Sequence, residues 1–388
     1  MNDEAAKLAP DFARVENGAL AGKFVASFWQ PIAMSKNCVV GIPKRVKILG
    51  NYYTLYRGED NVIRVVQDRC PHRGTSLAYG WVQGNSIRCR YHGWKFDGAG
   101  RGEEFPAETA TYARKVCLKT YPTREYLGMI FAFLGEGEPP DFTRFPELED
   151  ESRGELLAQA VVLPYNFFQR VENDHDEVHG HYTHVFMKDF GLEGMPKITG
   201  RETEYGMVSI ATRPDGTIFT AHGFMPNILF RQVPIPQDKT KMTIHLAWRV
   251  PIDDATTLSF MVNRVGSFDE SMRKPMAEAE DYREITRKLM NCEMTLEDVD
   301  PNHPLLPVIQ DTVSMGGQGV IADRSSEHLG QSDRGIALLR KIWAREMQAI
   351  SEGKARTKFY RPADFTFDEK EFAALTRRGH SHPGVAAS

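Results

Sequence analysis

Two short segments, each with one cysteine and one histidine, constrain the fold of this 388-residue chain more than any other feature. They are Cys70-x-His72 and Cys89-x2-His92. Thiolates and imidazoles gathered in this way are typical ligands of a metal group. Tight loops are favoured by the glycines in and beside these segments: Gly74, Gly80, Gly84 and Gly93. We therefore expect two tight loops that grip a metal group between them.

The identity of that metal group is open on spacing alone. Two buried structural cysteines and two unrelated histidines are the plainest interpretation. Zinc is a rival, because two cysteines and two histidines can form a tetrahedral site, but zinc pairs are usually separated by two to four residues and Cys70-x-His72 is tighter. A Rieske centre requires this mixture, with two cysteines on one iron and two histidines on the other. The pattern favours the Rieske centre, since each loop can then grip both irons.

A second cluster of polar residues is the stretch ENDHDEVHGHYTH (172–184), which holds four histidines and four acidic residues. Buried charges and imidazoles are costly unless they are paired or bind a metal. His175 and His179 are four positions apart and would share one face of a helix. His179 and His184 are five positions apart, which is about 140° around an ideal helix. Helix geometry alone therefore favours His175 with His179.

Composition and charge exclude several classes of protein. With 41% hydrophobic and 26% charged residues, the chain has ordinary globular composition. The net charge of −4 argues against a nucleic-acid partner. The longest strongly apolar run, residues 127–135, is too short to span a bilayer, and the acidic N-terminus does not resemble a secretory signal. Five cysteines in so long a chain do not form a disulfide framework. We therefore expect a cytoplasmic protein with reduced thiols and no membrane segment.

The chain length favours two domains, and the residue pattern indicates where they divide. Residues 39–150 are rich in strand-like runs. Two of these runs, 45–57 and 62–67, are joined by a turn signal and predict a hairpin. The stretch 135–155 is rich in proline and acidic residues and is the best boundary between the domains.

Beyond this boundary the pattern predicts strands and then helices. Strand-like runs lie between residues 200 and 260. The segment 267–291 looks helical, with Ser267 as an N-cap, and 334–350 repeats apolar residues at three- and four-residue steps. We therefore predict an α+β protein divided into three parts: an N-terminal segment (1–38) that packs on the last domain, a β-rich domain (39–150) and a larger domain (151–388).

The first cluster resembles a known family. Residues 69–98 resemble the Rieske domain of the ring-hydroxylating oxygenases, and the resemblance extends over nearly the whole chain. Rieske subunits of respiratory complexes carry an extra cysteine after each ligand pair, where Gly74 and Gly93 stand here. The resemblance implies an all-β Rieske domain followed by a catalytic domain with an antiparallel sheet wrapped by helices, a helix-grip arrangement. It also implies four ligands for one [2Fe-2S] cluster: Cys70, His72, Cys89 and His92.

The second cluster resembles the mononuclear iron motif of the same family, Asp-x2-His-x4-His. On this resemblance, His179 and His184 bind a non-haem Fe(II). Asp176 would not bind the iron but would accept a hydrogen bond from a ligand imidazole. The unequal spacing implies a helix interrupted between the two ligands, where Gly180 makes a break easy. His175 is the first substitute for either ligand.

A third iron ligand must come from elsewhere, because non-haem Fe(II) oxygenases use two histidines and one carboxylate. Residues 304–335 resemble the segment that supplies this carboxylate in the phthalate-dioxygenase-like branch, which implies Asp311. A solvated or capping role is the plainer interpretation of Asp311, and Asp323 and Glu297 are the next candidates. Three positions at the iron would stay open for O2, water and a nearby substrate.

A Rieske cluster and a mononuclear iron in one chain imply the terminal oxygenase component of a multicomponent system. The chain lacks the glycine-rich dinucleotide motif and the cysteine spacing of a plant-type ferredoxin. Electrons from NADH would therefore come through a separate reductase with a flavin and a ferredoxin-type cluster, with or without a separate ferredoxin. The resemblance also implies a homotrimer, or stacked trimers, in which Asp176 links His92 of one subunit to His179 of its neighbour.

The resemblance implies a small aromatic carboxylate as the substrate, attacked either on the ring, to give a dihydroxylated product, or at an aryl ether. An O- or N-demethylating monooxygenase is the alternative, because pocket shape decides which carbon faces the iron. Arg231 is a candidate anchor for the carboxylate. Two other classes remain as rivals. A Rieske electron-transfer protein would carry the cluster without the mononuclear iron, and a zinc-stabilised binding module would carry neither.

Overall fold

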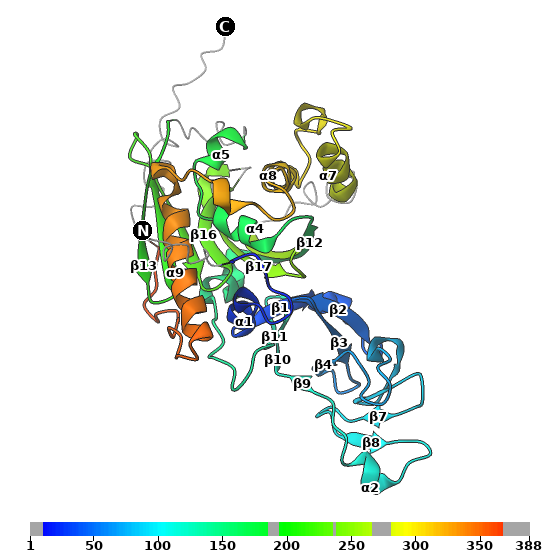
Figure 1. Ribbon diagram of the computed structural model, residues 1–388. Coiled ribbons are helices and arrows are strands. Elements are labelled where there is room, and N and C mark those ends of the chain that lie inside the picture. Colours follow the sequence, from blue (N-terminus) through cyan, green and yellow to red (C-terminus); the bar gives the residue numbers. More distant parts are fainter. Residues whose placement is uncertain (1–10, 185–193, 236–237, 266–280, 368–388) are drawn as a thin grey trace.

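The computed structural model describes residues 11–184, 194–235, 238–265 and 281–367. A β-rich region lies at one end of the molecule, and a larger region with a long sheet and several helices lies at the other (Figure 1). The predicted class, an α+β chain with an N-terminal β domain and a large antiparallel sheet behind it, is confirmed. Within the described ranges, no helix is both long and apolar enough to cross a bilayer.

Three small antiparallel sheets build the β-rich region. One has the order β1 (Gln30–Met34), β11 (Met129–Ala132), β10 (Thr123–Tyr126). Another has the order β2 (Lys44–Ile48), β3 (Asn51–Arg57), β4 (Ile63–Gln67), β9 (Thr120–Tyr121). The third has the order β5 (Trp81–Gln83), β6 (Ser86–Arg88), β7 (Lys95–Phe96), β8 (Gly102–Glu104). Two short helices border these sheets: α2 (Ala110–Ala113) and α3 (Pro146–Glu149).

The segment 45–67 forms two hairpins, whereas the sequence predicts one. The expected strand 45–57 is split at Leu49 and Gly50, whose φ angles are 53° and 75°. The N–H groups of this turn donate to Pro251 and Ile252 carbonyl oxygens, at 2.9 and 2.8 Å. The predicted hairpin is present as β3 and β4, but the single strand 45–57 was wrong: Leu49 is apolar and buried, so the turn does not interrupt the apolar pattern. The partners that hold it lie about 200 residues away in the chain, a long-range contact of the kind that local sequence patterns do not show.

One seven-stranded antiparallel sheet forms the centre of the larger region. Its order is β12 (Glu155–Leu163), β18 (Thr257–Val265), β17 (Asp238–Pro251), β16 (Ile228–Ile235), β15 (Ile218–Phe224), β14 (Gly206–Thr212), β13 (Lys197–Thr203). Strands β13 to β18 follow one another as a meander. The last of them, β18, pairs with β12 along the whole length of β12. The strands predicted between residues 200 and 260 therefore belong to one sheet.

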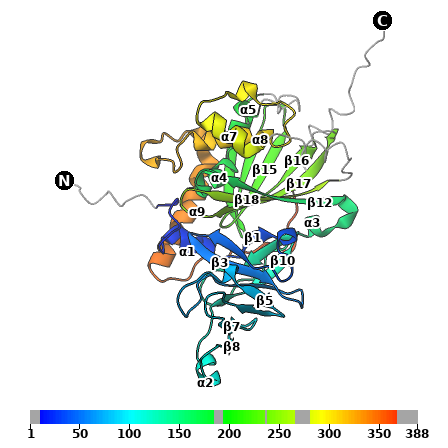
Figure 2. The same cartoon turned by 90° about the vertical axis from the view of Figure 1, so that its right-hand side faces the viewer.

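The helix predicted at 334–350 is present as α9 (Arg334–Ser351), which lies beside β13 and β14 (Figure 1, Figure 2). Its apolar stripe is buried: Leu339, Ile342, Trp343 and Met347. The N-terminal helix α1 (Leu20–Ala26) packs against α9, with Phe24 and Trp343 in an edge-to-face contact at 4.9 Å. The described residues 11–38 thus contact the larger region through α1 and join a small sheet through β1. The division at residues 38 and 150 stays a prediction.

Four helices gather at the end of the large sheet that is far from β7 and β8 (Figure 1). They are α4 (Phe167–Asn173), α5 (His179–Tyr182), α7 (Tyr282–Met290) and α8 (Leu306–Gly316). Asn166 caps α4 by accepting from Phe168 N, and α8 packs against both α4 and α7. Of the helix predicted at 267–291, α7 is the described part. The expected N-cap Ser267 lies outside the described residues.

Candidate metal sites

The first cysteine–histidine pair lies on the loop after β4, and the second lies on the loop between β6 and β7. The two loops share one backbone geometry. In each, the cysteine N–H donates to the carbonyl five residues later, and the glycine N–H four residues later donates to the cysteine carbonyl. These glycines, Gly74 and Gly93, have φ angles of 78° and 74°, which a residue with a Cβ adopts only with strain. The tight loops that the sequence predicts are therefore present, and the two loops have the same hydrogen-bond pattern.

The side chains of the two loops face one another. Cys70 and Cys89 are buried, and their mutual hydrogen bond raises the pKa of Cys70 and lowers the pKa of Cys89 to about 6. The rings of His72 and His92 are 4.5 Å apart, and Trp94 stacks on His72 at 4.3 Å. Nδ1 of His72 is buried without a hydrogen-bond partner, which costs free energy unless a ligand occupies it. Two thiols and two imidazoles thus fit the ligand set of a Rieske cluster.

A second group consists of His179, His184 and Asp311. His179 begins α5, His184 follows this helix, and Asp311 lies in α8. Nε2 of His184 is 3.2 Å from Oδ1 of Asp311, and Nε2 of His179 is 3.6 Å from the same oxygen. One potential ligand atom from each residue lies within 4.8 Å of the others, and the described ranges contain no other such group of three. This Oδ1 is buried without a hydrogen-bond partner, so the group is suited to share a cation.

Two neighbours that the sequence did not indicate support this group. Nδ1 of His184 is 3.0 Å from Oε1 of Gln310, while Nε2 on the other side of the ring faces Asp311. Nη2 of Arg170, on α4, is 3.4 Å from Oδ2 of Asp311. Burial raises the pKa of Asp311, but the charge of Arg170 and the contact with His184 outweigh burial and hold that pKa below its usual value. Both contacts depend on how α4, α5 and α8 pack, and no local pattern could have predicted them.

Asp176 occupies the bend between α4 and α5. Its Oδ1 accepts from the N–H groups of Val178 and His179, at 2.9 and 3.3 Å. Its Oδ2 is 3.8 Å from Nδ1 of His179, which is buried without a hydrogen-bond partner. The side chain of Asp176 is 27% exposed, so it faces the imidazole and the surface at once. The helix does end between the two ligands, as expected, because α5 stops at Tyr182 before His184, but the break is not at Gly180, which lies inside α5.

The substitutes considered for these ligands lie elsewhere. His175 is buried in the core, with Nδ1 3.2 Å from Oγ of Ser209, and burial lowers its pKa to about 4. Asp323 and Glu297 are exposed on short turns. The pair favoured by helix geometry, His175 with His179, is therefore not the pair that the fold brings to the carboxylate, because α4 ends before His175.

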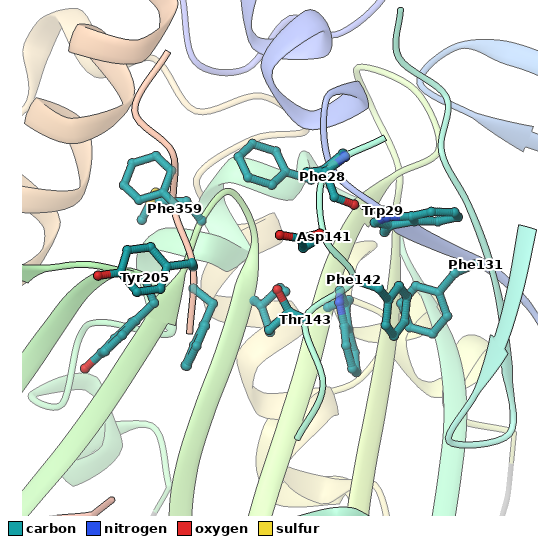
Figure 3. Close-up of a pocket in the computed structure, with 14 residues that line it drawn as sticks. Phe28, Trp29, Phe131, Asp141, Phe142, Thr143, Tyr205 and Phe359 are labelled. Carbon is teal, nitrogen blue, oxygen red and sulfur yellow. Dashed lines mark hydrogen bonds between the residues drawn. The ribbon is translucent and has the colours of Figure 1, made fainter. Parts of the chain in front are cut away.

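Two cavities border the large sheet. Figure 3 shows one of about 540 Å³, whose aromatic lining includes Phe28, Trp29 and Phe359. None of the candidate metal ligands lines it. The other, of about 220 Å³, is lined in part by Asp311 and Arg170 and therefore lies directly beside the second group. It is smaller than the usual small-ligand site.

Comparisons with known proteins agree with this geometry. Residues 28–122 match the family of Rieske [2Fe-2S] domains. The chain is 31% identical to the oxygenase subunit of 5,5'-dehydrodivanillate O-demethylase from Sphingobium sp. (strain NBRC 103272 / SYK-6), over 88% of this chain and 80% of that protein. It is 27% identical to the alpha subunit of phenoxybenzoate dioxygenase from Ectopseudomonas oleovorans, over 96% and 91%. A solved oxygenase–ferredoxin complex of carbazole 1,9a-dioxygenase has the same fold, with a TM-score of 0.62, 21% identity, and coverage of 86% and 97%.

The fold and the two groups of ligand-type side chains define an oxidoreductase that couples a [2Fe-2S] cluster to a mononuclear iron. The chain belongs to the Rieske non-haem iron oxygenase family and is the terminal oxygenase component of a multicomponent system. The predicted family, function class and cofactors are thereby confirmed. The rival classes, a zinc-stabilised module and a Rieske protein for electron transfer alone, have no support.

Proposed function

We propose that each metal of the family is bound by one of the two groups described above. The ligands of the [2Fe-2S] cluster are then Cys70, His72, Cys89 and His92. The ligands of the mononuclear iron are His179, His184 and Asp311. The observation that supports this assignment best is the buried Oδ1 of Asp311, which has no hydrogen-bond partner although two imidazole nitrogens lie 3.2 and 3.6 Å away. A cation between these three atoms would satisfy all of them.

When bound, the two metals supply single electrons and a place where O2 is reduced beside the substrate. The residues of the chain orient this chemistry. Oε1 of Gln310 accepts a hydrogen bond from Nδ1–H of His184, so Nε2 carries the lone pair that a metal needs. Arg170 keeps Asp311 ionised at neutral pH. The burial of Asp311 limits the access of water to the reacting side.

Asp176 is proposed to connect the two metals across a subunit boundary. Its exposed edge can accept a hydrogen bond from a histidine of a neighbouring copy, while Oδ2 lies near Nδ1 of His179. Within one chain, the cluster loops and α5 lie at opposite ends of the molecule (Figure 1). A ring of three copies would bring His92 of one subunit to Asp176 of the next. This arrangement supports the proposed homotrimer, or stacked trimers.

The proposed redox partners are a reductase that takes electrons from NADH and, between it and the oxygenase, a ferredoxin. The solved carbazole dioxygenase complexes contain a ferredoxin bound to their oxygenase. In this chain, the loops around the proposed cluster expose aromatic side chains: Tyr79, Trp81 and Tyr91. Exposed aromatic residues beside a redox centre suit a contact surface for a partner. A cytoplasmic location remains a prediction.

The proposed substrate is a small aromatic carboxylate, hydroxylated on the ring or attacked at an aryl ether. Several relatives are named for aromatic acids, among them phenoxybenzoate, phthalate and 3-chlorobenzoate. Demethylation of a methoxy or methylamino compound is the alternative, and one relative is an O-demethylase. Release of formaldehyde during turnover with a panel of methoxybenzoates distinguishes demethylation from ring dihydroxylation.

Arg231, the anchor that the sequence suggested for the carboxylate, is already paired. Its Nη2 is 2.5 Å from Oε1 of Glu177, and both side chains are nearly buried. Neither residue lines the cavity beside Asp311. Nε of Arg231 is buried without a hydrogen-bond partner, so Arg231 keeps one donor and stays a proposed anchor for the carboxylate.

Cys70→Ser is expected to remove the [2Fe-2S] cluster, its colour and its paramagnetic signal in the reduced state, because a hydroxyl does not replace a thiolate at these irons. Iron and sulfide analysis with electron paramagnetic resonance of the purified variant measures this. Cys117→Ser, at an exposed cysteine, is the matched control and should retain the full signal. An unchanged reduced spectrum in Cys70→Ser would refute the assignment of the cluster.

A further inference from the structure

A series of stacked aromatic rings connects one proposed ligand of the cluster with the surface of the β-rich region. The indole of Trp94 lies parallel to the imidazole of His72, with the ring centroids 4.3 Å apart, and Phe105 stacks on Trp94 at 3.8 Å. Tyr112, on α2, lies edge-on to Trp94 and Phe105, at 6.0 and 6.5 Å. Trp94 and Phe105 are buried, but Tyr112 is 44% exposed. Ring contacts therefore lead from His72 to solvent.

The two proposed histidine ligands differ in what covers them. His92 lies against the exposed ring of Tyr91, at 3.8 Å, and is the proposed exit for electrons toward Asp176 of a neighbouring subunit. His72 is covered by the indole of Trp94 instead. Because the exit uses one histidine, the aromatic stack at the other histidine is available for the entry of electrons.

The segment that carries the cluster loops and α2 is positively charged. Residues 69–119 contain nine lysines and arginines and four acidic residues, a net charge of +5, whereas the whole chain has a net charge of −4. Three of the four acidic side chains already pair with cations of the same segment. Arg114 and Lys115, directly after α2, are exposed and form no ion pair within the described residues. A protein with an acidic surface is therefore attracted to this part of the molecule.

Helix α2 lies at the tip of the β-rich region, at the opposite end of the molecule from α5 (Figure 1, Figure 2). A protein that docks at this tip leaves the surface around Asp176, which precedes α5, free for a neighbouring copy. It also leaves the end of the large sheet that carries the proposed iron ligands open to a small substrate. The tip is therefore suited to receive a large partner during turnover.

We propose that electrons enter the cluster through Tyr112 and Trp94, from an acidic ferredoxin-type partner that docks on α2 beside Arg114 and Lys115. This inference rests on the proposed function and deepens it by assigning the surface and the route of electron entry. One electron passes from the reduced [2Fe-2S] cluster of the partner to the oxidised Rieske cluster, and no bond or proton changes place. The transfer is downhill, because plant-type ferredoxins have lower potentials than Rieske centres. Tyr91 then belongs to the exit.

The docking surface is tested on the full-length protein with both metals bound, and the donor is a chemically reduced plant-type [2Fe-2S] ferredoxin with an acidic surface. The proteins are mixed without O2 in a stopped-flow instrument, and reduction of the Rieske cluster is followed. The second-order rate constant should fall steeply as salt is added. Arg114→Gln combined with Lys115→Gln should lower it about tenfold at low salt and weaken its salt dependence. Lys354→Gln with Lys358→Gln removes two exposed cations of the larger region and should react as the parent does.

The route is tested by the first-order rate at saturating ferredoxin, which reports transfer within the complex. Tyr112→Leu should lower this rate severalfold and Tyr112→Phe should restore it, because only the second variant keeps the ring. The midpoint potential and reduction by dithionite should stay parental in both, which a merely structural defect would change. Trp94→Leu should slow transfer further, and the Tyr112 pair decides the route even if Trp94→Leu loses the cluster. Tyr360→Leu, at an exposed tyrosine of the larger region, is the matched control.

Three results would overturn the inference: a parental first-order rate in Tyr112→Leu, a second-order rate that depends neither on salt nor on Arg114 and Lys115, or a larger loss of reduction rate in Tyr91→Leu than in Tyr112→Leu. The Rieske signal is measured on the same samples. If the parent lacks this signal, the proposed cluster site fails. If the parent carries the signal and dithionite reduces it, any of the three results rejects the entry route alone.

Discussion

Asp311→Ala is expected to abolish turnover and to remove the mononuclear iron, while the Rieske signal stays as in the parent. Asp311 provides the carboxylate of the proposed three-ligand site, and two imidazoles alone hold Fe(II) weakly. Its loss also leaves Arg170 with one carboxylate in place of two, so a lower melting temperature should accompany the loss of iron. Metal analysis, the reduced-state spectrum and product formation on one preparation measure all of these effects.

Two comparisons make this result specific. Glu297→Ala removes an exposed acid that is one of the two alternatives for the third ligand, and it should leave iron content and turnover unchanged. His184→Ala should reproduce the result of Asp311→Ala, because both residues offer atoms to the same point. Retention of iron and activity by Asp311→Ala would show that the carboxylate ligand lies elsewhere, and Asp323 would be examined next.

Asp176→Asn is expected to slow electron transfer between the metals by orders of magnitude with both metals still bound. The substitution keeps the size of the side chain but removes its charge and one acceptor. Oδ2 of Asp176 faces Nδ1 of His179 at 3.8 Å, so the aspartate is placed to link this ligand to a histidine of a neighbouring subunit. Reduction of the cluster by the reductase should proceed normally. Reoxidation of pre-reduced protein by O2 with substrate present, followed by stopped-flow absorbance, is where the loss should appear.

The control for this experiment is Asp323→Asn. Asp323 also accepts two short local hydrogen bonds, from Ser325, but lies on an exposed turn and belongs to neither group of ligand-type side chains. It should reoxidise at the rate of the parent. A parental reoxidation rate in Asp176→Asn would refute the bridge. Loss of mononuclear iron from Asp176→Asn would instead assign it a part in binding the metal or in holding the bend before α5.

The sequence predicted the parts of this molecule that depend on local patterns. The two loops that carry the first group have the same turn geometry, so their ligand residues and their glycines could be recognised together in the sequence. The helix α9 follows from its apolar steps. The chain turn at Leu49 was missed because its stabilising hydrogen bonds come from Pro251 and Ile252. Spacing likewise misplaced the helix break at Gly180, because the ends of such short helices depend on their tertiary neighbours.

The surroundings of the second group could not be predicted for the same reason. The resemblance singled out Asp311, but its position beside His179 and His184 depends on the packing of α8 against α4. Arg170 becomes relevant only because α4 packs beside α8 and brings it to Asp311. Arg231 was a candidate by charge, and the fold pairs it with Glu177 while its Nε has no hydrogen-bond partner. Residue type indicates which side chains can bind an anion, and packing decides which of their donors are already used.

The iron and sulfide content of the purified full-length protein tests the central claim most directly. A [2Fe-2S] cluster and one mononuclear site require about three iron atoms and about two acid-labile sulfides per chain, together with a Rieske-type signal after reduction. We expect this composition, with the third iron lost selectively from His179→Ala. A colourless protein that contains zinc, or a coloured one that keeps only two irons per chain after reconstitution with Fe(II), would contradict the assignment of two metal sites in one terminal oxygenase.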